Sequence, residues 1–186
     1  SDGIYAQSLG NSSASVVQVS TADVTTLGDT SRGIYAQSDA GTGSGGQVNV
    51  TSDAVTTLGD ESTGIYAQSI GATGAAEVTV DVIGNISTFG INSYGIWAQS
   101  DGVKTKAGSV SITSVNNVQT QGNDSTGIFA QSIGTNGGTA VNVQHTGNII
   151  TMGNDSLGIY AQSASPEGTG DIVNVTVIGD TSTVGD

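Results

Sequence analysis

Six aromatic side chains recur at one position of a repeated segment, and their type and spacing suit ligand recognition. The segment has the form Gly-Ile-aromatic-Ala-Gln-Ser and occurs six times. The aromatic residues are Tyr5, Tyr35, Tyr66, Trp97, Phe129 and Tyr160. If the repeats stack, the rings form a column that can bind sugar rings along its length or contact a neighbouring fibre. The alternative is ring-on-ring packing that covers a groove beneath the Gly-rich loops, and ring stacking alone is enough to favour it.

The residue types that catalysis needs are scarce. His145 is the only histidine, and no recurring carboxylate suggests a proton relay, so we expect a solvated side chain. The three basic residues are Arg32, Lys104 and Lys106, whereas β-helix enzymes that cleave polysaccharides use clusters of Asp, Lys and Arg. Glycine-rich stretches such as 41–46 precede neither Gly-Lys-Ser nor a helical pattern, so they are not phosphate loops. We therefore expect no enzymatic activity and no catalytic residue.

Acidic residues gather at one place in the repeat, beside recurring serines. They are Asp29, Asp60, Asp124 and Asp155. A stacked column of carboxylates could bind calcium through oxygen ligands, but Asp side chains in turns also bond their own backbone. Ile91 and Asn92 interrupt the column, and the glycine-rich nonapeptide of calcium-binding β-rolls is absent. We expect no specific metal site and no cofactor, and weak calcium binding stays an open alternative.

Charge and composition exclude several classes of partner. The formal net charge is −13, so neither nucleic acid nor an anionic membrane surface is expected to bind. Cysteine is absent, which excludes disulfides and thiol chemistry. No apolar run reaches the roughly 18 residues of a membrane span, so direct membrane insertion is not expected. The first residues lack the pattern of a secretion signal, so any such signal would lie outside this sequence.

The segments that must position these residues repeat at about 31 residues. The Gly-Ile dipeptide begins at Gly3, Gly33, Gly64, Gly95, Gly127 and Gly158. Each repeat holds three strand-like pieces: the Gly-Ile segment, an alternating piece such as 78–80, and a third piece such as 86–88. Apolar and polar residues alternate with the period of a strand, and no stretch has a helical period. A unit of this size buries its apolar face by stacking on further copies.

Constant strand positions with slightly variable loops predict an all-β, right-handed parallel β-solenoid of about six coils, with three short strands per coil. A β-propeller fits less well, because its blades need four strands in about 40 residues. We expect one array over residues 1–186, as a fragment of a longer fibre. Its repeats are 1–30, 31–61, 62–92, 93–124, 125–155 and 156–186.

Strand parity assigns the faces of each repeat. In the first strand Ile, Ala and Ser should point inward, because the opposite parity would bury glutamine and expose isoleucine. A column of glutamines should then hydrogen-bond from coil to coil as an amide ladder. It contains Gln7, Gln37, Gln68, Gln99, Gln131 and Gln162. One threonine also recurs per coil, as at Thr88, but it should point inward like the apolar residue two positions before it, so an ice-binding threonine array is not expected.

The repeats have the form Ser-x-Gly-Ile-Tyr-Ala-Gln-Ser, followed by Ile-Gly or a Gly-rich loop, as in 62–71 and 125–134. This pattern resembles passenger repeats of large autotransporter adhesins from Gram-negative bacteria. The resemblance covers all six repeats. It implies a long β-solenoid at the bacterial cell surface or outside the cell, which acts in adhesion, forms surface fibres or contributes to biofilm. The loops at 104–106 and 165–167 depart from the usual glycine run.

These observations favour a non-enzymatic structural or adhesive segment of a secreted bacterial fibre. Its expected partners are further coils or copies of itself at both ends, and glycans or neighbouring fibres at its side. The first alternative is a carbohydrate-binding solenoid that uses the aromatic column. The second is a self-polymerising filament subunit, because a whole number of repeats without a polar cap leaves strand edges unpaired.

Overall fold

A computed structural model describes residues 1–185 and contains three strands in each of six coils. The first strands of the coils are β1 (Ile4–Gly10), β4 (Ile34–Ala40), β7 (Ile65–Gly71), β10 (Ile96–Gly102), β13 (Ile128–Gly134) and β16 (Ile159–Ala164). The second strands are β2 (Val17–Thr21), β5 (Val48–Ser52), β8 (Val78–Val82), β11 (Val110–Val115), β14 (Val141–Thr146) and β17 (Val173–Ile178). The third strands are β3 (Val24–Thr26), β6 (Val55–Thr57), β9 (Ile86–Thr88), β12 (Val118–Thr120), β15 (Ile149–Thr151) and β18 (Thr181–Thr183).

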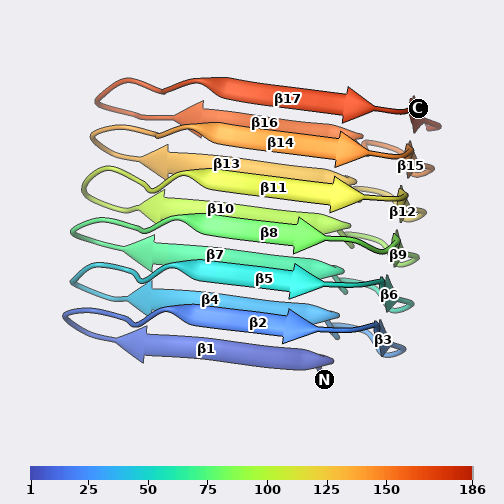
Figure 1. Cartoon of the computed structure of the whole chain (residues 1–186), viewed down its shortest axis with the longest axis horizontal. Helices are drawn as coiled ribbons and strands as arrows, with labels where there is room; N and C mark the ends of the chain where they lie inside the picture. Colours follow the sequence, from blue (N-terminus) through green and yellow to red (C-terminus); the bar gives the residue numbers. More distant parts are fainter. Residues whose placement is uncertain (186) are drawn as a thin grey trace.

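Equivalent strands of successive coils pair in parallel and form three six-stranded sheets, which we call the first, second and third sheet. Figure 1 shows the coils stacked from the N-terminus at the bottom to the C-terminus at the top. Identical positions face one another, as in the pairs Ile96↔Ile65 and Gln99↔Gln68. The predicted all-β parallel solenoid of about six coils is therefore confirmed. Within residues 1–185 no helix is long and apolar enough to cross a membrane.

The core is a narrow aliphatic space between the three sheets. Ile65, Ala67, Val78, Val80 and Ile86 are all fully buried, and one coil supplies them from β7, β8 and β9. The predicted inward position of Ile, Ala and Ser in the first strand is confirmed. The small alanine side chain lets the wall formed by the second sheet approach closely, so no large residue is needed to fill the centre.

The buried serine of each first strand holds the Gly-rich loop in place. Ser69 Oγ donates to the carbonyl of Gly46 at 2.9 Å and accepts the N–H of Ala76 at 3.0 Å. Ser100 makes the equivalent pair of bonds, to Ala76 and Gly108. One buried hydroxyl therefore joins the loops of two successive coils and satisfies a backbone group in each.

The corner after the third strand is built the same way in the first five coils. Thr57 Oγ1 donates to the carbonyl of Ser62 at 2.5 Å, and the Ser62 N–H donates to Ser93 Oγ at 3.0 Å. The residue before the serine has a left-handed backbone, as at Glu61 with φ 53°. This hydrogen-bonded corner explains why its length is constant in the sequence. It also buries the recurring threonine, as predicted.

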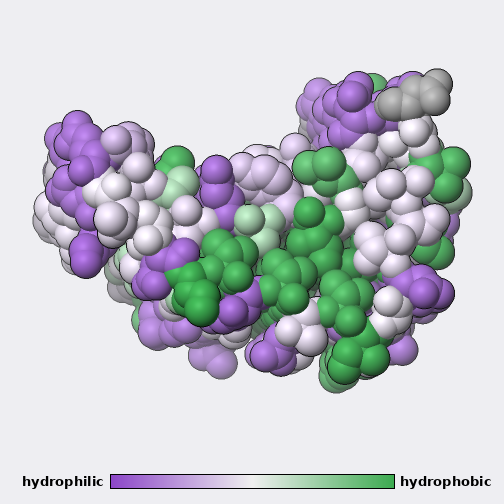
Figure 2. Space-filling model, turned by 90° about the horizontal axis from the view of Figure 1, so that it is seen from above, coloured by the Kyte–Doolittle hydropathy of each residue, from purple (hydrophilic) through white to green (hydrophobic). Residues whose placement is uncertain are grey.

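The last described coil leaves part of the core exposed. Val173 and Val175 occupy the positions of the buried Val141 and Val143 one coil earlier, yet both are exposed. Figure 2 looks down the stack onto this coil and shows a band of apolar residues across it, with the outline of the molecule hollowed on one side.

Candidate functional site

The six predicted aromatic residues form a continuous column on the outward face of the first sheet. Their ring centroids lie 4.7 Å apart for Tyr5 and Tyr35, 5.2 Å for Tyr35 and Tyr66, 5.7 Å for Tyr66 and Trp97, 4.5 Å for Trp97 and Phe129, and 4.9 Å for Phe129 and Tyr160. Most neighbouring rings are nearly parallel. Separations of this size belong to offset stacks, in which part of each ring face stays uncovered.

The glutamine column lies beside the rings and forms the predicted amide ladder. Each Nε2 donates to the Oε1 of the glutamine one coil further on, at 2.6–2.8 Å, from Gln7 to Gln162. Tyr35 and Tyr66 add hydroxyl bonds to Oε1 of Gln37 and Gln68, at 2.6 and 2.8 Å. The aromatic column and the glutamine ladder are thus one hydrogen-bonded unit that runs along the stack.

Burial raises the pKa of two tyrosine hydroxyls in the column, those of Tyr35 and Tyr66. Burial, the larger cause, and the neighbouring Tyr35 together raise the pKa of Tyr66 to about 12, against the opposing charge of Arg32. The pKa of Tyr35 is also raised, mainly by burial. Both hydroxyls therefore remain hydrogen-bond donors to the glutamines throughout the physiological pH range.

Side chains from the corner cover much of the aromatic column. The covering position is the residue directly before each Gly-Ile segment. There the Arg32 guanidinium carbon lies 4.6 Å from the Tyr35 centroid and 4.9 Å from that of Tyr66. Tyr94 packs edgewise against Trp97, with centroids 4.8 Å apart. Tyr5 in the first coil is 60% exposed, whereas Tyr35 is only 9% exposed. A polysaccharide that lies along the whole column would have to displace Arg32 and Tyr94.

One stretch of the column is open. A pocket of about 270 Å³ lies beside Phe129 and Tyr160. The corner supplies its other walls, which are Tyr94, Asp124, Thr126, Asp155 and Leu157. Two carboxylates and two ring surfaces therefore meet around one space, and only the three-dimensional structure brings them together.

The four carboxylates that were expected to form one column occupy two different positions. Asp29 and Asp60 stand two residues before the corner serine, and each accepts a backbone N–H of the next coil on Oδ1, from Asp60 and Ile91. Asp124 and Asp155 stand one residue before the serine, at the left-handed position. The prediction of a single carboxylate column was therefore wrong. Counting residues back from the corner serine in the sequence would have separated Asp29 and Asp60 from Asp124 and Asp155. Among residues 1–185 no three His, Cys, Asp or Glu side chains are grouped to hold a metal ion.

His145 was expected to be solvated, and this was wrong, because it is 1% exposed and lies in the core. Its place follows the parity of Val141 and Val143, and the equivalent residue two coils earlier is the buried Val82. Nδ1 lies 2.7 Å from Ser114 Oγ. A serine beside a histidine resembles a nucleophile with its base, but both are closed to solvent, so no substrate reaches them.

We expect acid to destabilise the fold through His145. Burial lowers the pKa of His145, although backbone groups of Asn148 and Gly147 oppose the shift. The unfolded chain, with its pKa of about 6.5, then takes up a proton at a higher pH than the folded chain. The contribution of neutral His145 to the free energy of unfolding is therefore fully present above about pH 6.5. Below that pH it falls by at most about 1.4 kcal/mol per pH unit, until the pH reaches the pKa of the folded state.

Urea denaturation between pH 5 and 8 measures this slope. His145→Gln, which keeps a polar side chain beside Ser114, should remove it. Because His145 is the only histidine, an unchanged slope in the variant would contradict the assignment.

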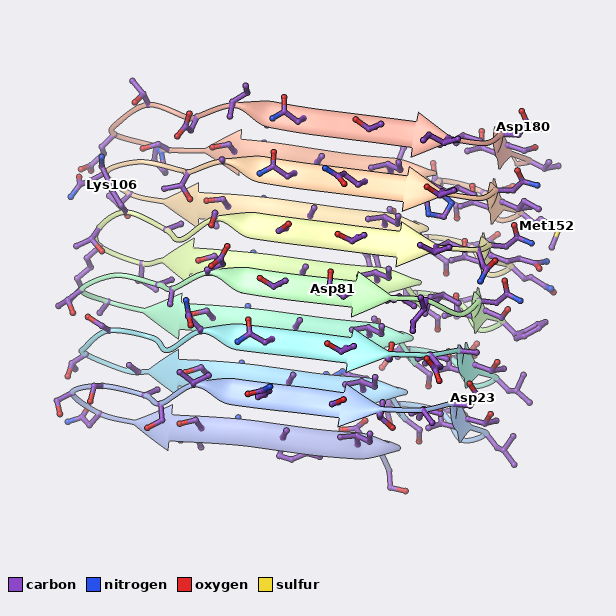
Figure 3. The ribbon with its side chains drawn as sticks, viewed as in Figure 1. Asp23, Asp81, Lys106, Met152 and Asp180 are labelled. Atoms are coloured by element: carbon purple, nitrogen blue, oxygen red, sulfur yellow. The ribbon has the colours of Figure 1, made fainter. Side chains whose placement is uncertain are left out.

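An exposed apolar row was missed in the sequence. It consists of the residue after the recurring threonine, and its apolar members are Leu27, Leu58, Phe89, Met152 and Val184. The sequence does contain a signal for this row, because an apolar residue recurs directly after the third strand-like piece of most repeats. Figure 3 shows Met152 at the edge of the solenoid that also carries Asp23 and Asp180, with Lys106 at the opposite edge and Asp81 on the second sheet.

Comparison of the chain with protein-family models, with curated proteins and with solved structures gives no match.

Proposed function

We propose that this chain is a non-enzymatic structural and adhesive segment of a secreted bacterial surface fibre. The observation that carries the proposal is the glutamine ladder, because a recurring side chain whose bonds all run from coil to coil serves the length of the stack. The corner serines also bond from coil to coil, because the backbone N–H of each donates to the hydroxyl of the corner serine in the next coil at 2.9–3.0 Å. Residues that recur are thus used to propagate a rod of constant cross-section.

The surface of the rod is where the repeats differ. The outward positions in the middle of the second sheet are exposed and vary among Ser, Thr, Asp and Gln, as at Ser20, Thr51, Asp81 and Gln144. Such a face can change its side chains at little cost to the fold, which suits a lateral surface that contacts cells, matrix or neighbouring fibres. The net charge of −13 favours the solubility of such a rod.

Further coils, of the same polypeptide or of another copy, are the partners that we propose at the ends of the array. Successive coils within the array pair in parallel with equivalent residues in register, as Ile96 with Ile65. A further coil of the same kind can pair by the same contacts. The resemblance to autotransporter passenger repeats supports export to the cell surface.

Antibodies raised against this chain test the location in cells of the source organism. We expect labelling of intact cells, and a denatured polypeptide much larger than 18.3 kDa on immunoblots if the coils continue. Labelling that needs permeabilised cells would overturn the proposal.

Beads that carry the folded chain test adhesion separately, on host cells, matrix proteins and a glycan array. Beads with the same chain unfolded by heat are the matched control, because composition and charge are identical. Retention of the folded beads above the control is expected on at least one surface. Equal retention on all surfaces would leave a stalk without adhesive contacts and would contradict the adhesive half of the proposal.

A further inference from the structure

The open pocket on the aromatic column occupies a position that is filled elsewhere in the same molecule. Thr126 is the residue directly before Gly127 in the fifth coil, and Arg32 is the residue directly before Gly33 in the second coil. Thr126 has a short side chain that is 6% exposed, and it is one of the residues that line the pocket. The longer Arg32 instead reaches over the rings.

The two ring pairs at these positions have the same geometry. Tyr35 and Tyr66 lie 5.2 Å apart at an interplanar angle of 7°, and Phe129 and Tyr160 lie 4.9 Å apart at 6°. The guanidinium carbon of Arg32 lies within 5 Å of both centroids of the first pair. The second pair presents the same ring surfaces to a pocket of about 270 Å³.

Charge adds a preference for a cation. Asp124 and Asp155 line the pocket, and they stand at the positions of Thr30 and Glu61 around Arg32. The open pocket therefore has two carboxylates where the filled one has a single acid at the same positions. Aromatic faces and carboxylates both attract cations, and the planar guanidinium group can stack on rings and pair with carboxylates at the same time.

We propose that this pocket binds the guanidinium group of an arginine side chain on a basic partner protein. Arg32 shows that the ring column accepts this group, and the net charge of −13 attracts a basic surface to it. The inference rests on the pocket and not on the proposed location of the chain, so either can fail alone.

The probe is N-acetyl-arginine methylamide, with the neutral N-acetyl-citrulline methylamide as the matched control. Trp97 reports on binding, because it is the only tryptophan and its ring lies 4.5 Å from Phe129. Amide chemical shifts of Thr126, Asp124 and Asp155 locate the site. We expect saturable changes at millimolar arginine, with citrulline weaker by about tenfold or more.

Two variants test the site itself. Thr126→Arg should fill the pocket in the manner of Arg32 and abolish binding. The double variant Asp124→Asn and Asp155→Asn should weaken binding by about tenfold, and it should fold because asparagine adopts the left-handed backbone readily. Salt should weaken binding to the unmodified chain more strongly than binding to the double variant.

Four results would overturn the inference. They are equal binding of citrulline, an affinity unchanged by both variants, no shift at millimolar arginine, and binding of a neutral oligosaccharide at the same residues in place of arginine. The last result would make the pocket a sugar site.

Discussion

Replacing Ile96 with alanine is expected to lower the free energy of unfolding by about 2–5 kcal/mol. Ile96 is 0% exposed, and its neighbours in the sheet are Ile65 and Ile128, which are also fully buried. The cavity would lie in the fourth of six coils, where coils on both sides hold the walls in place. In a stacked array stability is carried by contacts between neighbouring repeats, so one cavity weakens two interfaces.

Urea denaturation followed by circular dichroism measures this change. The matched control is Ile83→Ala, because Ile83 is 59% exposed and loses the same atoms. We expect the control to stay within about 0.5 kcal/mol of the unmodified chain. Similar losses for the two variants would mean that the column of isoleucines is not the core that holds the coils together.

Replacing Gly95 with alanine is expected to cost at least about 1–3 kcal/mol, although only one methyl group is added. The new Cβ would lie 2.5 Å from the carbonyl oxygen of Gly127 and 2.9 Å from Val118 Cγ1. The backbone cannot retreat, because the Gly95 N–H donates to Thr126 O and the Ile96 N–H donates to Gly127 O, both at 3.0 Å. The equivalent glycines of the first five coils approach the next coil in the same way, which explains the glycine of the Gly-Ile segment.

Gly41→Ala is the control for this substitution. The nearest atom to its added Cβ is Asn11 Oδ1 at 3.6 Å, an ordinary contact, and Gly41 does not have a left-handed backbone. Its thermal unfolding should therefore match that of the unmodified chain. If Gly95→Ala unfolds at the same temperature as Gly41→Ala, successive coils do not approach as closely as the structure indicates.

The sequence by itself determined the fold and its inner contacts. In a stacked coil each residue lies against its own equivalents, so the repeat length alone predicts that Gln99 meets Gln68 and that Ile96 meets Ile65. The alternation of apolar residues then assigns each side chain to the core or the surface. Even the buried position of His145 was available from this alternation, since it continues the inward series of Val141 and Val143.

Only the tertiary structure decided what surrounds the aromatic column. Arg32, Tyr94 and Thr126 share one position in the repeat, yet the first two cover rings and the third leaves a pocket. The left-handed corner sets the direction of Asp124 and Asp155, and a shift of one residue separates them from Asp29 and Asp60. Periodicity specifies contacts between equivalent residues along the stack. Contacts across the surface between different positions depend on side-chain length and backbone direction, which the repeat pattern does not contain.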